Sequence, residues 1–224
     1  MRVDVADDST AALGNALTMN ETLKCLDFSD NHITSTGWRE ISNCLAPTST
    51  ISELNLYDSN INDEIALIFF SALANNTTLE KLLLFSEHIT SDGWVLCFQQ
   101  LMDSRSALAN IGFGWDIDDE GVEALSTLVA NHMNTISSLC LTGNHLISAN
   151  GWNTVANVLW PSYTSKQKML RVGSSNQDTG SYPITNDVII DLVIALAGNS
   201  SLGLLELYDV DDDVDSAMEA LLTV

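Results

Sequence analysis

Histidine and cysteine are the residues of this chain best suited to bind a metal ion or to act in catalysis. Three of the four histidines stand just before a tryptophan, in His32–Trp38, His88–Trp94 and His145–Trp152. Imidazole and thiolate are zinc ligands, and a thiolate beside a histidine is a catalytic nucleophile. The cysteines are far apart and none forms a C-x-x-C pair; they are Cys25, Cys44, Cys97 and Cys140. Their spacing predicts neither a zinc site nor a disulfide scaffold.

Other catalytic patterns are also missing from the sequence. It contains no HExxH pair, no phosphate-binding glycine loop, no serine or cysteine nucleophile with a histidine partner and no paired carboxylates placed for acid–base chemistry. The acidic run Asp209–Asp215 fails as an EF-hand calcium loop, because Val214 and Ala220 stand where glycine and glutamate are needed. We therefore expect no enzyme activity, no metal and no cofactor.

Charge and composition restrict the kind of partner. The chain has 224 residues, 46% of them hydrophobic, with 30 acidic and 8 basic side chains and a formal net charge of −22. This content supports a folded core, and the negative charge opposes binding to nucleic acid or to an anionic membrane. No apolar run approaches the roughly 18 residues of a membrane span, and the first residues do not resemble a secretion signal. We expect a cytoplasmic protein with a protein or peptide partner, favouring a basic one.

The elements that position these residues are predicted by an internal repeat. The pattern L-x-x-L-x-L-x-x-N-x-I runs from Leu23 to Ile33 and recurs, with substitutions, from Ile51 to Ile61 and from Leu79 to Ile89. Further copies start at 108 and at 136, where the closing residue is Leu146, and weaker ones lie around Leu170 and from Leu202. The L-x-L alternation at the centre of each copy is typical of a strand with one buried face.

The second half of each copy has a helical period. Small or apolar residues follow at steps of four, as in Gly37, Ile41 and Leu45, which form one stripe of a helix. The same stripe recurs after every clear strand copy, ending with one at Val188, Leu192 and Leu196. Each repeat is therefore a strand followed by a helix, and neither buries its apolar face without its neighbours.

The repeats resemble the leucine-rich repeats of the ribonuclease-inhibitor-like class, which have about 28 residues and a full helix. Ala72–Leu79 is similar to the helix-to-strand junction of that class. The resemblance covers nearly the whole chain and implies an α/β solenoid, or horseshoe, of about seven repeats. Parallel strands would form its concave face and helices its convex face. The asparagine expected after the strand is kept only as Asn31 and Asn144; Ser59, Glu87, Asp116 and Val210 replace it.

A two-repeat period lies over the first, because only repeats one, three and five carry the histidine and the tryptophan. The chain looks as if a two-repeat unit had been duplicated. Strands about 4.8 Å apart place histidines of alternate repeats about 10 Å apart, too far to share a zinc ion. Cys25 and Cys140, four repeats apart, exceed the disulfide limit of about 7 Å. We expect the tryptophans to pack between repeats and all four cysteines to be free thiols.

The organisation expected is a single solenoid domain over residues 1–224, interrupted by an irregular insertion at about 160–183. The insertion combines a basic cluster with glycines and serines, and it is a second candidate for partner contact. Neither end has a polar capping repeat, so the chain is expected to be a fragment of a longer array or one closed by short terminal helices.

The strand copies also predict a binding surface. Side chains between and just after the buried pair point away from the helices, which places Tyr57, Leu83 and Phe85 side by side on adjacent strands, with Trp115 beyond them. Trp115 lies just beyond Gly114, whose missing side chain would leave room for a ligand. Exposed aromatics are common in binding hot spots, and an acidic rim steers a basic partner. The alternative is that Phe85 and Trp115 pack against adjacent loops. The rim consists of Asp27, Asp30, Glu53 and Asp58.

The function expected is that of a non-enzymatic protein–protein interaction scaffold, which binds through its concave face or flanking loops. Two alternatives remain open. One family that resembles this repeat class activates the GTPase Ran, but no arginine stands at the strand ends that would carry that activity here; these residues are Asp30, Asp58, Ser86, Trp115, Gly143 and Asp209. The other is a purely structural spacer within a larger multidomain protein.

Overall fold

A computed structural model describes residues 7–45, 49–132, 135–158, 168–173, 189, 192 and 202–208. The chain divides into two compact units, residues 1–113 and residues 114–224. The first unit contains helices α1 (Asp7–Met19), α2 (Ser35–Ser42), α3 (Asp63–Leu73) and α4 (Ser91–Leu101), with the 3-10 turn η1 (Asn43–Leu45) after α2. Its strands are β1 (Cys25–Asp27), β2 (Glu53–Tyr57), β3 (Lys81–Phe85) and β4 (Asn110–Gly114), the last residue of which opens the second unit.

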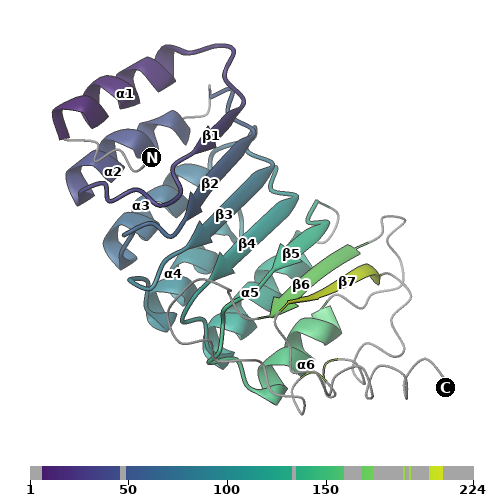
Figure 1. The fold of residues 1–224 in the computed structure, drawn as a ribbon. Coiled ribbons are helices and arrows are strands. Elements are labelled where there is room, and N and C mark those ends of the chain that lie inside the picture. The colour runs from purple at the N-terminus through teal and green to yellow at the C-terminus, as the bar shows by residue number, and fades with distance from the viewer. Residues whose placement is uncertain are drawn as a thin grey trace. The chain divides into compact units, whose positions relative to one another are not determined.

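The strands of the first unit follow one another in the sheet in chain order. β1 pairs with β2 and β2 with β3, all parallel, and Leu26, Leu54 and Leu82 stand opposite one another. Helices α1 to α4 lie side by side along one face of these strands, and no described helix covers the other face (Figure 1). Parallel strands alternating with helices confirm the predicted α/β repeat. Residues paired on adjacent strands are 28 positions apart in the sequence, which is the repeat period.

The core of the first unit forms between the sheet and the helices. The predicted helix stripes are buried, as Ile41, Phe69 and Cys97 show with at most 1% exposure. An aromatic cluster adds to this core: Phe70 of α3, Trp94 and Phe98 of α4 and Phe113 of β4 have ring centroids 5.3 to 6.4 Å apart. Trp38 and Trp94 are fully buried, which confirms that these tryptophans pack inside the repeats.

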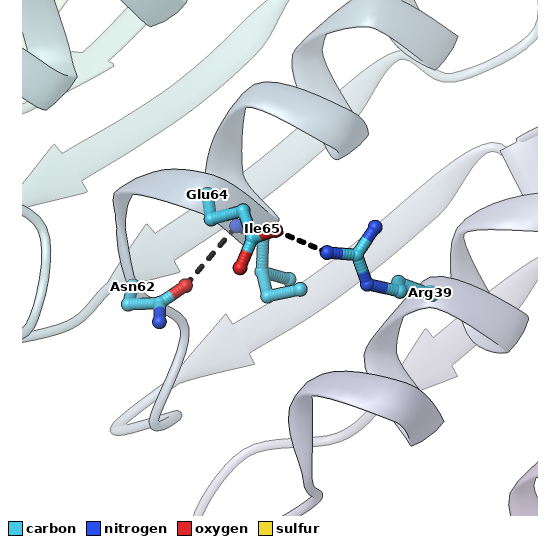
Figure 2. A network of polar contacts seen from close by, with 4 residues as sticks. All are labelled: Arg39, Asn62, Glu64 and Ile65. Atoms are coloured by element: carbon cyan, nitrogen blue, oxygen red, sulfur yellow. Dashed lines mark hydrogen bonds and ion pairs between the residues drawn. The ribbon is translucent and has the colours of Figure 1, made fainter.

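Helices α2, α3 and α4 each begin at a capping side chain. The Thr34 and Thr90 hydroxyls accept hydrogen bonds from the amides of Gly37 and Gly93 at the starts of α2 and α4. At the start of α3 the Asn62 side chain accepts one from the Ile65 amide at 3.1 Å (Figure 2). These bonds satisfy amides that the first helical turn leaves without partners. In the same view Arg39 of α2 forms an ion pair with Glu64 of α3.

In the third repeat the residue at the asparagine position, Glu87, does not make the bond between repeats. Ser86, rather than Glu87, is the buried residue, and its hydroxyl donates to the Ile61 carbonyl of the preceding repeat at 2.8 Å. Glu87 is exposed. In the second unit the amide of Asn144 donates to the Leu141 carbonyl at 3.1 Å, while its oxygen accepts from the Ile117 amide. The bonds between repeats are therefore kept by two different residue types.

The second unit repeats the same alternation. It contains helices α5 (Asp119–Asn131) and α6 (Ala149–Val158) and strands β5 (Ser138–Cys140), β6 (Lys168–Gly173) and β7 (Leu202–Tyr208). β5, β6 and β7 pair in parallel and in chain order, with one register irregularity at Lys168 and Met169. The weak sixth and seventh copies thus form strands as predicted.

One residue of the fifth copy is corrected by the structure. Ile147 is buried at 4% exposure, whereas Leu146, predicted to close the strand half, is 48% exposed. The extra residue therefore precedes the closing position. Most of the predicted insertion at 160–183 and the whole acidic run 209–215 lie outside the described residues. Helices long and apolar enough to span a membrane are not found in the described part of the chain.

Candidate functional site

The helix-free face of β1, β2 and β3 presents most of the candidate binding residues. Alternate residues of these strands point away from the helices, since their neighbours in the chain are buried in the core. The register places Asp27 opposite Asn55 and Asn55 opposite Leu83. Tyr57 stands opposite Phe85 in the next row. The structure thus brings Tyr57, Leu83 and Phe85 together, as predicted.

Tyr57 and Phe85 form the aromatic centre of this face. Their ring centroids are 5.2 Å apart and the planes are inclined by 46°. Contacts of this kind between aromatic side chains on adjacent strands are favourable beyond the area that they bury. Tyr57 remains half-buried, as does Leu83. The pair therefore gives the face a supported aromatic side chain that a partner is able to reach.

Phe85 differs from the sequence expectation, because only 2% of it is exposed. The cause is Gly112 of β4. A methyl group at Gly112 would lie 2.7 Å from Leu83 Cδ2 and 3.1 Å from Phe85 Cε2, so both side chains lean over the glycine. The space above Gly112 is therefore filled by side chains of the protein itself. Phe85 therefore supports Tyr57 by contact and contributes almost no exposed area to the surface.

Asp27 at the β1 end of the face is an exposed carboxylate with ordered neighbours. Its Oδ1 accepts hydrogen bonds from the Ser29 hydroxyl at 2.6 Å and from the Ser29 amide at 2.9 Å. The hydroxyl bond is the largest cause that lowers the pKa of Asp27, and the Ser29 amide and the Asn55 side chain add to it against the opposing effect of partial burial. Asn55 repeats the turn in β2, accepting from the Tyr57 amide. Asp27 is therefore ionised at neutral pH.

Asp30 and Asp58 follow the first and second strands at equivalent positions. Both have left-handed backbones, with φ of 57° and 50°. Glycine, asparagine and aspartate adopt this conformation at the lowest cost. The Asp30 amide donates to the Tyr57 carbonyl at 3.0 Å, which ties the first turn to the second strand. Asp30 is exposed and Asp58 half-buried. Successive turns thus carry negative charge along the same edge as Tyr57.

Glu53, the fourth residue of the predicted acidic rim, has a cation beside it. Lys81 Nζ lies 3.5 Å from Glu53 Oε2, and the two residues are directly opposite in the β2–β3 register. Lys81 was missed as part of this face, although it follows Glu53 by one repeat of 28 residues and that spacing predicts the pairing. The pair reduces the negative charge at the start of the strands, so the acidic character concentrates near Asp27, Asp30 and Asp58.

Trp115 belongs to the second unit and is half-buried. The surface of the first unit therefore consists of the other seven candidates. The four cysteines carry no disulfide, as expected. Burial raises the pKa of Cys44 to about 12 and also raises that of Cys97, whereas Cys25 is exposed. Within the described residues no group of three potential metal ligands occurs.

Comparison with known proteins gives a likeness of fold. No protein-family model and no curated protein matches the chain. Among solved structures, a chain of the yeast Rad7 and Elc1 complex is 21% identical with a TM-score of 0.53, and the match covers 94% of this chain and 52% of that one. This chain thus spans about half the length of that neighbour. Leiomodin-1 actin-binding site 2 is 20% identical with a TM-score of 0.43, over 84% of this chain and 87% of that one. The likeness to the yeast chain is consistent with a leucine-rich-repeat-like fold.

Proposed function

We propose that this chain is a non-enzymatic protein-interaction scaffold that binds a protein or peptide through the helix-free face of β1 to β3. The observation that carries the proposal is the half-buried pair Tyr57 and Leu83, supported by Phe85 and bordered by Asp27 and Asp58. Partly exposed aromatic and aliphatic side chains beside charged groups are typical of interface hot spots. The acidic border favours a basic partner.

The proposal extends to the architecture that carries this face. It assumes a single leucine-rich-repeat horseshoe of about seven repeats over residues 1–224, with the strands on the concave side. The neighbour of known structure was solved as a complex of two proteins, Rad7 and Elc1. A fold of this kind is therefore compatible with a scaffold role. Four thiols without a disulfide favour a reducing, cytoplasmic setting.

Selection of a displayed peptide library against the whole chain tests the proposal. The affinity of the selected peptides is then compared among the native protein, Tyr57→Ala, Leu83→Ala and the control Leu96→Ala. Leu96 is a suitable control because it is 46% exposed on α4, on the helix side of the same unit. We expect the two strand-face substitutions to weaken binding by about thirtyfold or more each, in line with hot-spot losses of about 2 kcal/mol or more.

The control determines how the result is interpreted. Leu96→Ala is expected to leave the affinity unchanged, and unfolding curves of all variants check that they remain folded. Equal affinity for the three variants would place the binding surface elsewhere. Acceleration of GTP hydrolysis by a small GTPase in the presence of this chain would instead favour a GTPase activator and would contradict a non-enzymatic scaffold.

A further inference from the structure

We propose that the partner segment presents an arginine, whose guanidinium lies over the Tyr57 ring near Asp27 and Asp30, followed by an apolar side chain that packs on Leu83. This inference rests on the proposed function and names the chemistry of the ligand. It commits to an arginine-bearing peptide segment as the occupant of the face. Three features of the first unit support it.

The first feature is the polarity of the face. Along one row of the sheet the outward side chains change from charged Asp27 through polar Asn55 to apolar Leu83. In the adjoining row Tyr57 of β2 contacts Phe85 of β3. Phe85 and Leu83 thus lie on the β3 side of Tyr57, and the carboxylates lie on the β1 side. A ligand matching this order has a cationic group and an apolar group next to each other.

The second feature is the charge that the protein leaves without a cation. The partners of Asp27 are Ser29 and Asn55, both neutral. Among the described residues no salt bridge involves Asp27 or Asp30; the one on this face joins Lys81 to Glu53. The low pKa of Asp27 keeps its charge at neutral pH. A cationic ligand would therefore meet carboxylates with capacity for further hydrogen bonds.

The third feature is the combination of an aromatic ring with carboxylates. A guanidinium is flat, stacks on aromatic faces and donates two parallel hydrogen bonds to one carboxylate. A lysine ammonium is a compact, strongly hydrated charge, so it is less suited to contact an aromatic ring and a carboxylate at the same time. Tyr57 with Asp27 and Asp30 thus matches arginine better than lysine.

The aspartate turns allow the charge to be removed without disturbing the fold. Asp30 has φ of 57°, a conformation that asparagine adopts as readily as aspartate. Asp30→Asn therefore keeps the backbone and the shape of the side chain while removing the carboxylate charge. Because Asp30 is exposed, this variant is also expected to fold normally.

The test is a nuclear magnetic resonance titration of the whole chain with N-acetyl-Arg-Gly-Leu-amide. Parallel titrations use the same tripeptide with lysine or with citrulline, the neutral analogue of arginine. We expect amide shifts at Asp27, Asn55 and Tyr57. Affinity is expected to fall by about tenfold with citrulline and several-fold with lysine. Asp30→Asn is expected to weaken arginine peptide binding several-fold, and Leu96→Ala to leave it unchanged.

Other outcomes overturn the inference in distinguishable ways. If citrulline or lysine binds as well as arginine, recognition of a guanidinium is wrong. If library peptides without arginine bind the face and depend on Tyr57 and Leu83, the inference fails while the proposed function stands. If no peptide shifts a residue of β1 to β3, both fail. If Asp30→Asn binds the arginine peptide like the native protein, the assignment of that carboxylate is wrong.

Discussion

The carboxylate of Asp63 accepts a hydrogen bond from the Thr90 amide and a second from the Thr90 hydroxyl, each at 2.8 Å. Asp63 is the first residue of α3 and Thr90 caps α4, so one side chain connects two successive helix starts. In the second unit Asp119 makes the same two bonds with Ser148. A methyl group at Gly93 would lie 2.1 Å from Asp63 Oδ1, so this position requires glycine. This connection between helix starts thus recurs every second repeat, in step with the two-repeat period of the sequence.

Replacing Asp63 by alanine is expected to destabilise the protein by about 1–3 kcal/mol, since hydrogen bonds to a charged group are stronger than neutral ones. Urea unfolding of Asp63→Ala, Thr90→Ala and the double variant measures the loss and the coupling between the two residues. Asp103→Ala, an exposed carboxylate after α4, is the control and is expected to change stability by less than about 0.5 kcal/mol. Additive losses in the double variant would contradict a direct bond.

Two buried serines, Ser59 at the repeat-asparagine position and Ser86 one residue before that position in the next repeat, are expected to respond in opposite ways. Ser86→Ala leaves the Ile61 carbonyl without its 2.8 Å bond and should cost about 1–2 kcal/mol. The Ser59 hydroxyl is buried with no hydrogen-bond partner among the described residues, so Ser59→Ala should be neutral or stabilising. Thermal or urea unfolding of both variants compares them directly. If Ser59→Ala lost more stability than Ser86→Ala, the hydrogen-bonding roles given to the two hydroxyls would be wrong.

The strand register was predictable from the sequence, because a spacing of 28 residues places Leu26, Leu54 and Leu82 in line and stacking leaves little freedom. The repeat pattern did not identify Ser86, the residue before Glu87, as the buried side chain that bonds to the preceding repeat. It could not show the burial of Phe85, which depends on how that ring leans toward a glycine on another strand.

The sequence predicted which residues form the candidate site better than it predicted their contacts. Alternation along the strands correctly placed Tyr57 beside Phe85. The Glu53–Lys81 pair was readable from the repeat period but was overlooked. The turn that orders Asp27 depends on a hydroxyl two residues later, and a serine at that spacing has several possible roles in a strand end.

Thiol labelling is expected to separate the four cysteines into two classes. Cys25 is exposed and Cys140 partly so, whereas Cys44 and Cys97 are at most 1% exposed. A neutral thiol reagent at pH 7.5 should modify Cys25 fastest and Cys140 next, and the buried pair only on unfolding. Denatured, non-reduced protein should give four thiols. A denatured count of two or zero would contradict the free-thiol structure.

Stability should fall at alkaline pH in a way that depends on Cys44. Burial raises its pKa from 9.0 to about 12, so above pH 9 the unfolded chain loses a proton that the folded chain keeps. This contribution to stability is complete below pH 9 and declines by about 1.4 kcal/mol per pH unit as the pH rises toward 12. Unfolding free energies from pH 8 to 10.5 should therefore fall less steeply in Cys44→Ala. Parallel curves for the two proteins would contradict the buried thiol.

The bonds from Asp63 to Thr90 and from Asp119 to Ser148 also determine how this chain could be shortened. A deletion that joins Asp63 directly to Glu120 removes two repeats and leaves an aspartate facing Ser148. A deletion of one repeat would instead bring together a helix start and a cap that never meet in the native chain. We therefore expect the protein to tolerate the deletion of two repeats better than the deletion of one. Deletion of a single repeat should lower stability because of the mismatched pair at the new junction.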